Sequence, residues 1–196
     1  EVQKAHFLAL GAGGEYAEAL TLWSKMKKST RKQGDLQQLQ QKAGHFALLA
    51  AKPEQARALY SELPRSAALF FRALSFLYEG NTKQAAALLR KTLQRQSGAR
   101  LENDALALLF ILRYFDKSSI QEAAAGQSGG TRLQALVGHY LQGEYREAAL
   151  LLKSLHSSLS GAGRRWVRLL ALRLFVRDRA YDEAMNVLSA LEDEQG

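Results

Sequence analysis

The chain has 196 residues, of which 47% are hydrophobic and only two are proline, and its formal net charge is +8. Leu, Ala, Gln, Arg and Lys are abundant while Val and Ile are scarce, a composition that favours helices over strands. The absence of cysteine excludes disulfides, thiolate metal sites and cysteine nucleophiles. The sequence therefore predicts an all-α fold.

A short phrase recurs along the chain: a small or turn residue, often an aromatic residue, then Glu or Gln, then Ala. Its copies begin near residues 14, 51, 80, 143 and 179. Each copy follows an apolar segment of helical length, and a second segment with helical spacing of apolar residues comes after it. The predicted unit is therefore helix, turn, helix. The expected first helices include residues 6–10, 45–49, 69–78, 101–115, 133–141 and 166–176.

The alanine that closes each phrase sets the period, and we call it the anchor alanine. The anchor alanines are Ala19, Ala56, Ala85, Ala148 and Ala184. The double gap between Ala85 and Ala148 predicts a degraded copy at residues 118–123. The two helices of a unit are expected to approach each other closely at the anchor alanines. A larger side chain at these alanines would force the helices apart.

Glycines at the phrase starts are expected to end the first helices in a left-handed conformation. Tyr16, Tyr145 and Tyr181 are expected to pack between the two helices.

The unit around residues 133–155 resembles the tetratricopeptide repeat superfamily. Tyr140, Gly143, Tyr145 and Ala148 fall at helix-packing positions of that family. The resemblance implies a right-handed superhelical solenoid of about five to six antiparallel helix hairpins, forming a single domain over residues 1–196. The glycine-rich residues 126–131 are the predicted hinge.

Members of this superfamily bind peptides, helices or whole proteins on the concave face formed by the first helices. Carried over by position, the resemblance predicts an apolar partner-binding groove, which suits an amphipathic helix or an extended hydrophobic segment. The alternative is that several of these residues are core between neighbouring hairpins. The predicted groove residues are His45, Phe70, Leu74, Leu77, Tyr78, Val137, Tyr140, Leu141, Arg173 and Arg177.

The chemistry-bearing residues do not form a recognisable catalytic or metal motif. The four histidines lack the spacing of helical metal ligands, and the paired carboxylates recur at helix starts, where negative charge complements the helix dipole. The glycine-rich residues 11–14 follow a helix and lack the lysine of a phosphate-binding loop. We expect no catalytic residue, cofactor or metal.

Positive charge is concentrated in the first half. Residues 1–100 carry 16 basic and 7 acidic side chains, a net charge of +9, whereas residues 101–196 have a net charge of −1. The densest run of positive charge, which we call the basic patch, consists of Lys25, Lys27, Lys28, Arg31 and Lys32. Such asymmetry attracts acidic partners, so an accessory nucleic-acid-binding module is the alternative function.

The sequence as a whole predicts a non-enzymatic adaptor, scaffold or chaperone-like module that binds a protein or peptide partner. No segment reaches the roughly 20 apolar residues of a membrane span, and no targeting segment is recognised. A soluble protein is expected, and its compartment is not predicted. Uncapped ends of a solenoid also allow self-association.

Overall fold

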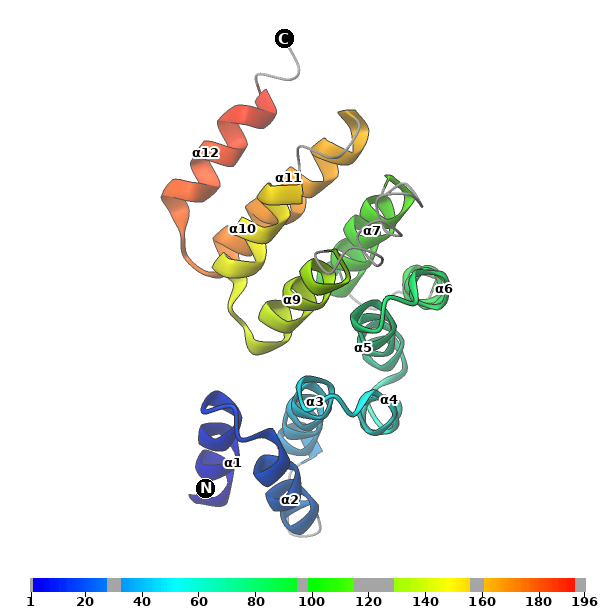
Figure 1. Cartoon of the computed structure of the whole chain (residues 1–196), viewed down its shortest axis with the longest axis vertical. Helices are drawn as coiled ribbons and strands as arrows, with labels where there is room; N and C mark the ends of the chain where they lie inside the picture. Colours follow the sequence, from blue (N-terminus) through cyan, green and yellow to red (C-terminus); the bar gives the residue numbers. More distant parts are fainter. Residues whose placement is uncertain (1, 28–32, 95–98, 115–128, 156–160, 193–196) are drawn as a thin grey trace.

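The computed structural model describes residues 2–27, 33–94, 99–114, 129–155 and 161–192, and these ranges form helices joined by turns (Figure 1). The all-α prediction is confirmed for this part of the chain. The handedness of a superhelix and the number of repeats stay predictions. The helices are α1 (Val2–Ala12), α2 (Tyr16–Met26), α3 (Gln33–Leu49), α4 (Pro53–Ser61), α5 (Arg65–Tyr78), α6 (Thr82–Leu93), α7 (Ala99–Tyr114), α9 (Gly129–Gln142), α10 (Tyr145–Leu155), α11 (Gly161–Arg177) and α12 (Tyr181–Glu192).

The turns that follow α1, α3, α5, α9 and α11 share one geometry. At each turn one residue has a positive φ, and the next residue donates its N–H to the carbonyl oxygen five residues back, at 2.8 to 2.9 Å. This arrangement satisfies carbonyl groups that the last turn of a helix leaves open. The glycine prediction is confirmed at three turns, and two turns use other residues. The left-handed residues are Gly14, Ala51, Gly80, Gly143 and Arg179.

The anchor alanines are buried, as the phrase predicts. Four of them are fully inaccessible and Ala184 is 4% exposed. The prediction for the turn tyrosines holds only in part. Tyr16 lies 5.8 Å from the ring of Phe46 and Tyr145 lies 5.8 Å from the ring of Tyr140. Tyr181 is 60% exposed, because no described helix covers the side of α12 on which it lies.

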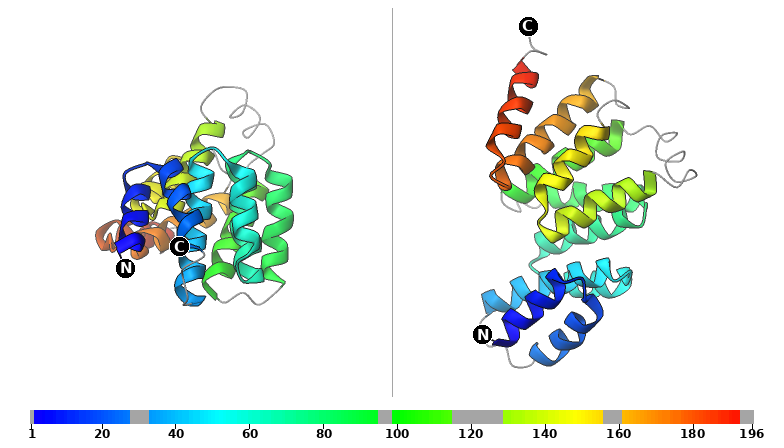
Figure 2. Two further views of the ribbon diagram at one scale, coloured as in Figure 1. Left: turned by 90° about the horizontal axis from the view of Figure 1, so that it is seen from below. Right: turned by 60° about the vertical axis from the view of Figure 1, so that its left-hand side comes forward.

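Consecutive helices pack on one another through most of the described chain. Each second helix contacts its own first helix and also the first helix that follows, as in α2 with α3, α4 with α5, α6 with α7 and α10 with α11. Helix α9 departs from this order, because it packs on α5 and α3, while α7 packs on α11 (Figure 2). Helices α1 and α12 lie toward opposite ends of the long axis (Figure 1).

Two of the sequence predictions fall wholly or partly outside the described residues. The degraded phrase at residues 118–123 is outside them. Of the predicted hinge, residues 126–128 are also outside, whereas residues 129–131 form the first turn of α9.

Helices α3 and α4 approach so closely at Gly44 that a side chain does not fit there. A Cβ atom at Gly44 would lie 2.3 Å from Cε1 of Tyr60. The Tyr60 side chain is fully buried and stacks on Phe71 with ring centroids 5.5 Å apart, so it has no room to withdraw. Glycine at position 44 is therefore a packing requirement.

We predict that Gly44→Ala lowers the free energy of unfolding by roughly 1–3 kcal/mol, because the added methyl group overpacks the core. Gly34→Ala is the matched control in the same helix. No atom lies within 4 Å of a Cβ built at Gly34, so that change should be neutral or stabilising by up to about 1 kcal/mol. Urea unfolding followed by circular dichroism measures both. Equal stability of the two variants would contradict the close approach.

Candidate protein-binding surface

The residues predicted to line a partner-binding groove lie mostly in the core. The structure brings many of them together, because α9 packs on α3 and α5 and occupies the face that the groove required. Tyr78, Tyr140, Arg173 and Arg177 are half-buried. The other six are at most 4% exposed and pack within the chain, which corrects the expectation of an open groove at these positions: His45, Phe70, Leu74, Leu77, Val137 and Leu141.

His45 is the polar member of this buried group. Its ring lies 5.2 Å from the ring of Phe71 and 6.0 Å from that of Tyr60. Burial and the positive charge of Lys42 lower the pKa of His45 to about 3, and the backbone of Leu141 offsets part of the shift. His45 is therefore neutral in the folded protein at neutral pH, and it acts as a core residue.

We predict that His45 makes the fold sensitive to mild acid. The unfolded chain binds a proton at position 45 below the ordinary histidine pKa of about 6.5, whereas the folded chain does not until the pH approaches 3. Stability should therefore fall by about 1.4 kcal/mol per pH unit below 6.5.

The check compares unfolding free energies at pH 6.5 and pH 5. Wild type and the control His6→Gln, which changes an exposed histidine, should both lose about 2 kcal/mol. His45→Leu should lose clearly less. An equal loss in all three proteins would show that His45 is not the group responsible.

Three of the predicted groove residues surround a buried carboxylate that sequence analysis did not single out. Asp104 of α7 is 2% exposed. Its Oδ2 accepts hydrogen bonds from the Tyr140 hydroxyl at 2.8 Å and from Nη2 of Arg177 at 3.0 Å. Nη2 of Arg173 forms an ion pair with Oδ1 at 2.9 Å. Burial and the Asp104 carboxylate raise the pKa of Tyr140.

This cluster joins four helices. The Arg177 guanidinium also lies over the rings of Tyr140 and Tyr145, at 5.6 and 5.0 Å from their centroids. Asp104 comes from α7, the tyrosines come from α9 and α10, and the arginines come from α11. The buried carboxylate is paired with two arginines and accepts charge-assisted hydrogen bonds, so the cluster acts as a clamp between helices. In the sequence, the position of Asp104 within the apolar segment 101–115 could have indicated that this carboxylate is buried and paired.

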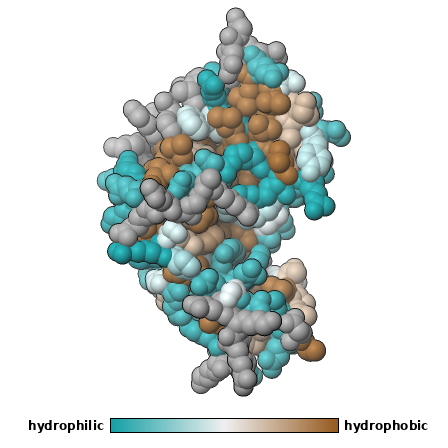
Figure 3. Space-filling model, turned by 180° about the vertical axis from the view of Figure 1, so that it is seen from behind, coloured by the Kyte–Doolittle hydropathy of each residue, from teal (hydrophilic) through white to brown (hydrophobic). Residues whose placement is uncertain are grey.

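The exposed apolar surface lies instead at the end of the helix array. Tyr181, Met185 and Leu188 follow one side of α12 at the spacing i, i+4, i+7, with 60%, 59% and 37% of their surfaces exposed. We call these three residues the α12 stripe. Val176, near the end of α11, is 50% exposed. In Figure 3 hydrophobic side chains gather over α11 and α12 at the upper end of the molecule.

The equivalent positions of the earlier hairpins are buried. Leu188 comes four residues after the anchor alanine Ala184, and at that offset the other units carry side chains that are at most 3% exposed: Trp23, Tyr60, Leu89 and Leu152. Burial varies one residue after the anchor: Leu20 is 5% exposed and Ala149 is fully buried, Arg57 and Ala86 are half-buried, and Met185 is exposed.

The difference follows from the neighbouring helices. In the earlier units, the first helix of the next unit packs on the second helix, as α11 does on α10. Among the described residues α12 packs on α11, and no later helix follows. The α12 stripe therefore occupies the position by which one hairpin contacts the next, and no helix of the described ranges covers it.

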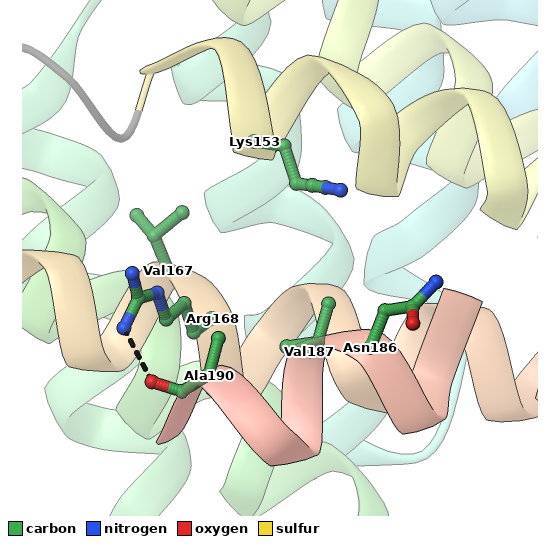
Figure 4. Close-up of a pocket in the computed structure, with 6 residues that line it drawn as sticks. All are labelled: Lys153, Val167, Arg168, Asn186, Val187 and Ala190. Atoms are coloured by element: carbon green, nitrogen blue, oxygen red, sulfur yellow. Dashed lines mark hydrogen bonds between the residues drawn. The ribbon is translucent and has the colours of Figure 1, made fainter. Parts of the chain in front are cut away.

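A small cleft lies next to α12, between α10, α11 and α12. Its volume is about 160 Å³. Figure 4 shows Lys153 of α10 on one side of the cleft, Asn186 and Val187 of α12 on the other, and Val167 of α11 beside them. Nη1 of Arg168 donates a hydrogen bond to the carbonyl oxygen of Ala190 at 2.8 Å, so this cation fixes α12 to α11. Asn186, Val187 and Ala190 lie on a different side of α12 from the α12 stripe, so the cleft is separate from that surface.

The described part of the basic patch is partly neutralised. Lys25 is exposed, and Nζ of Lys27 forms an ion pair with Oε2 of Glu62 at 2.5 Å. Lys28, Arg31 and Lys32 lie outside the described residues. The ion pair links the residue after α2 to the residue after α4 at the protein surface.

The described residues contain no group of three or more His, Asp or Glu side chains placed to hold a metal ion. In the same ranges, each helix is too short or too polar to cross a membrane. No family model, curated protein or solved structure matches the chain. Membership of the tetratricopeptide superfamily stays a prediction.

Proposed function

We propose that this chain is a non-enzymatic protein-interaction module that works as an adaptor or scaffold. It binds a helical segment of a partner protein on the end face formed by the α12 stripe and Val176. The observation that carries the proposal is the exposure of Leu188 at an offset that four other hairpins bury, with the exposed side chains of Tyr181 and Met185 beside it.

The apolar character of the stripe supports a protein ligand. Single exposed apolar side chains are common on soluble proteins, but a continuous row of large ones typically marks an interaction site. The i, i+4, i+7 spacing suits a second helix that lies along α12 and inserts its own apolar side chains between these residues. The way α11 covers α10 in this same chain is the template for such a contact.

The charges around the stripe restrict the partner. Helix α12 carries Asp182, Glu183 and Glu192 and has neither lysine nor arginine. Glu183 pairs with Arg146 of α10, whereas the side chains of Asp182 and Glu192 are exposed. An apolar helix without carboxylates beside its contact face is therefore the favoured ligand, because it brings no like charge to this acidic surface.

We predict that Met185→Glu reduces capture of partner proteins at least tenfold, because it places a charge in the apolar contact. The purified chain is immobilised, exposed to native lysate with and without nuclease, and the captured proteins are quantified by mass spectrometry. Leu150→Glu is the matched control, since Leu150 is 49% exposed but lies on α10 and not on the stripe.

Identical capture by wild type and Met185→Glu would contradict the proposed site. Capture that disappears with nuclease and falls steeply with salt would favour nucleic acid, because neutralised phosphates release counterions. A partner helix identified in this way should then bind with a negative heat-capacity change, the mark of buried apolar surface.

A further inference from the structure

The opposite end of the chain also exposes an apolar helix. Helix α1 carries apolar residues on nearly all sides, and Lys4 is its only charged residue apart from His6 when that is protonated. A helix of this kind is normally covered on more than one side. In the structure only Phe7 and Gly11 are buried, whereas Val2 is 83% exposed and Leu8 is 38% exposed.

The exposed side of α1 corresponds to a side that is buried in α11. Counted back from the anchor alanines, Val2, Ala5 and Ala9 of α1 occupy the offsets 17, 14 and 10. All three are exposed. In α11 the same offsets hold Val167, Leu170 and Leu174, which are at most 4% exposed and share one core cluster with Ala149 and Leu152 of α10.

Helices α1 and α12 thus expose the two halves of one contact. Helix α12 exposes the positions with which α10 receives α11, and α1 exposes the positions with which α11 covers α10. We propose that copies of this chain associate head to tail, with the α12 stripe of one copy packed on Val2, Ala5 and Ala9 of the next. This inference rests on the proposed function and names a second copy as the ligand of the α12 stripe.

The charges favour this pairing over the symmetric alternatives. Helix α1 has one lysine and no carboxylate, and α12 has three carboxylates and no lysine or arginine. Lys4 already pairs with Asp35 at 3.0 Å, so the contribution of α1 is the absence of negative charge more than a new ion pair. Packing α12 on a second α12 would bring acidic side chains together, which destabilises a contact. Packing α12 on α1 does not.

Such a contact is heterologous, because each copy uses two different surfaces. Heterologous contacts extend into open chains of copies unless the rotation between neighbours closes a ring. Association should therefore continue beyond the dimer as the protein concentration rises. In this association the α12 stripe contacts a first helix, as the second helices of the earlier hairpins do within the chain.

The test measures the molar mass of the purified chain by sedimentation velocity over a wide concentration range, with Met185→Glu, Ala9→Glu and the control Leu150→Glu. Wild type and Leu150→Glu should rise above the 21.7 kDa of one copy. Each of the other two variants alone should stay at one copy. An equimolar mixture of Met185→Glu and Ala9→Glu should form a dimer and stop there, because each variant retains one intact surface and the two surfaces are complementary.

The mixture separates a lost contact from a misfolded variant, since a misfolded chain would not restore the dimer. Wild type that stays at one copy at every concentration would overturn the inference, and so would association that survives Met185→Glu. A chain that stays at one copy but loses a different captured protein on Met185→Glu would overturn self-association and leave the proposed function standing.

Discussion

The structure depends on one repeated contact, in which the second helix of a hairpin is covered by the first helix of the next. The side chain four residues after the anchor alanine is a large residue that is at most 3% exposed in four units, and that of Tyr60 stacks on Phe71 of the following first helix. Burial of such a side chain contributes roughly 1.5–3 kcal/mol. Because each unit gains this contribution from its neighbour, stability in such an array is shared between units, and the terminal units lack part of it.

Two other interactions give the chain a shape that a simple stack of hairpins would not have. Helix α9 packs on α3 and α5, so their apolar faces are covered within the chain. The Asp104 carboxylate, held by Tyr140, Arg173 and Arg177, ties α7 to α9 and α11. These contacts bury the apolar faces of the first helices within the chain. The α12 stripe, in contrast, stays exposed.

The sequence was sufficient for the local structure and insufficient for the site, for physical reasons. The turn phrase specifies backbone geometry directly, so the left-handed glycines and buried anchor alanines were predictable. The apolar period of a first helix shows that one face is covered, but a partner and the chain's own α9 bury Leu74 equally well. Asp104 and Arg177 are 73 residues apart, and no local pattern links them. Exposure of Met185 was also not predictable, because its sequence context matches that of the buried Ala149.

The central claim is that the α12 stripe is a hairpin-to-hairpin contact without its covering helix. The most direct measurement is the thermal unfolding of a chain in which a second copy of residues 156–192 is appended after Glu192. If the claim is correct, the added α11 sequence packs on the α12 stripe. The melting temperature and the helical signal then both rise, and Met185→Glu cancels the increase in melting temperature. An unchanged melting temperature, with the added segment digested readily by protease, would contradict the claim.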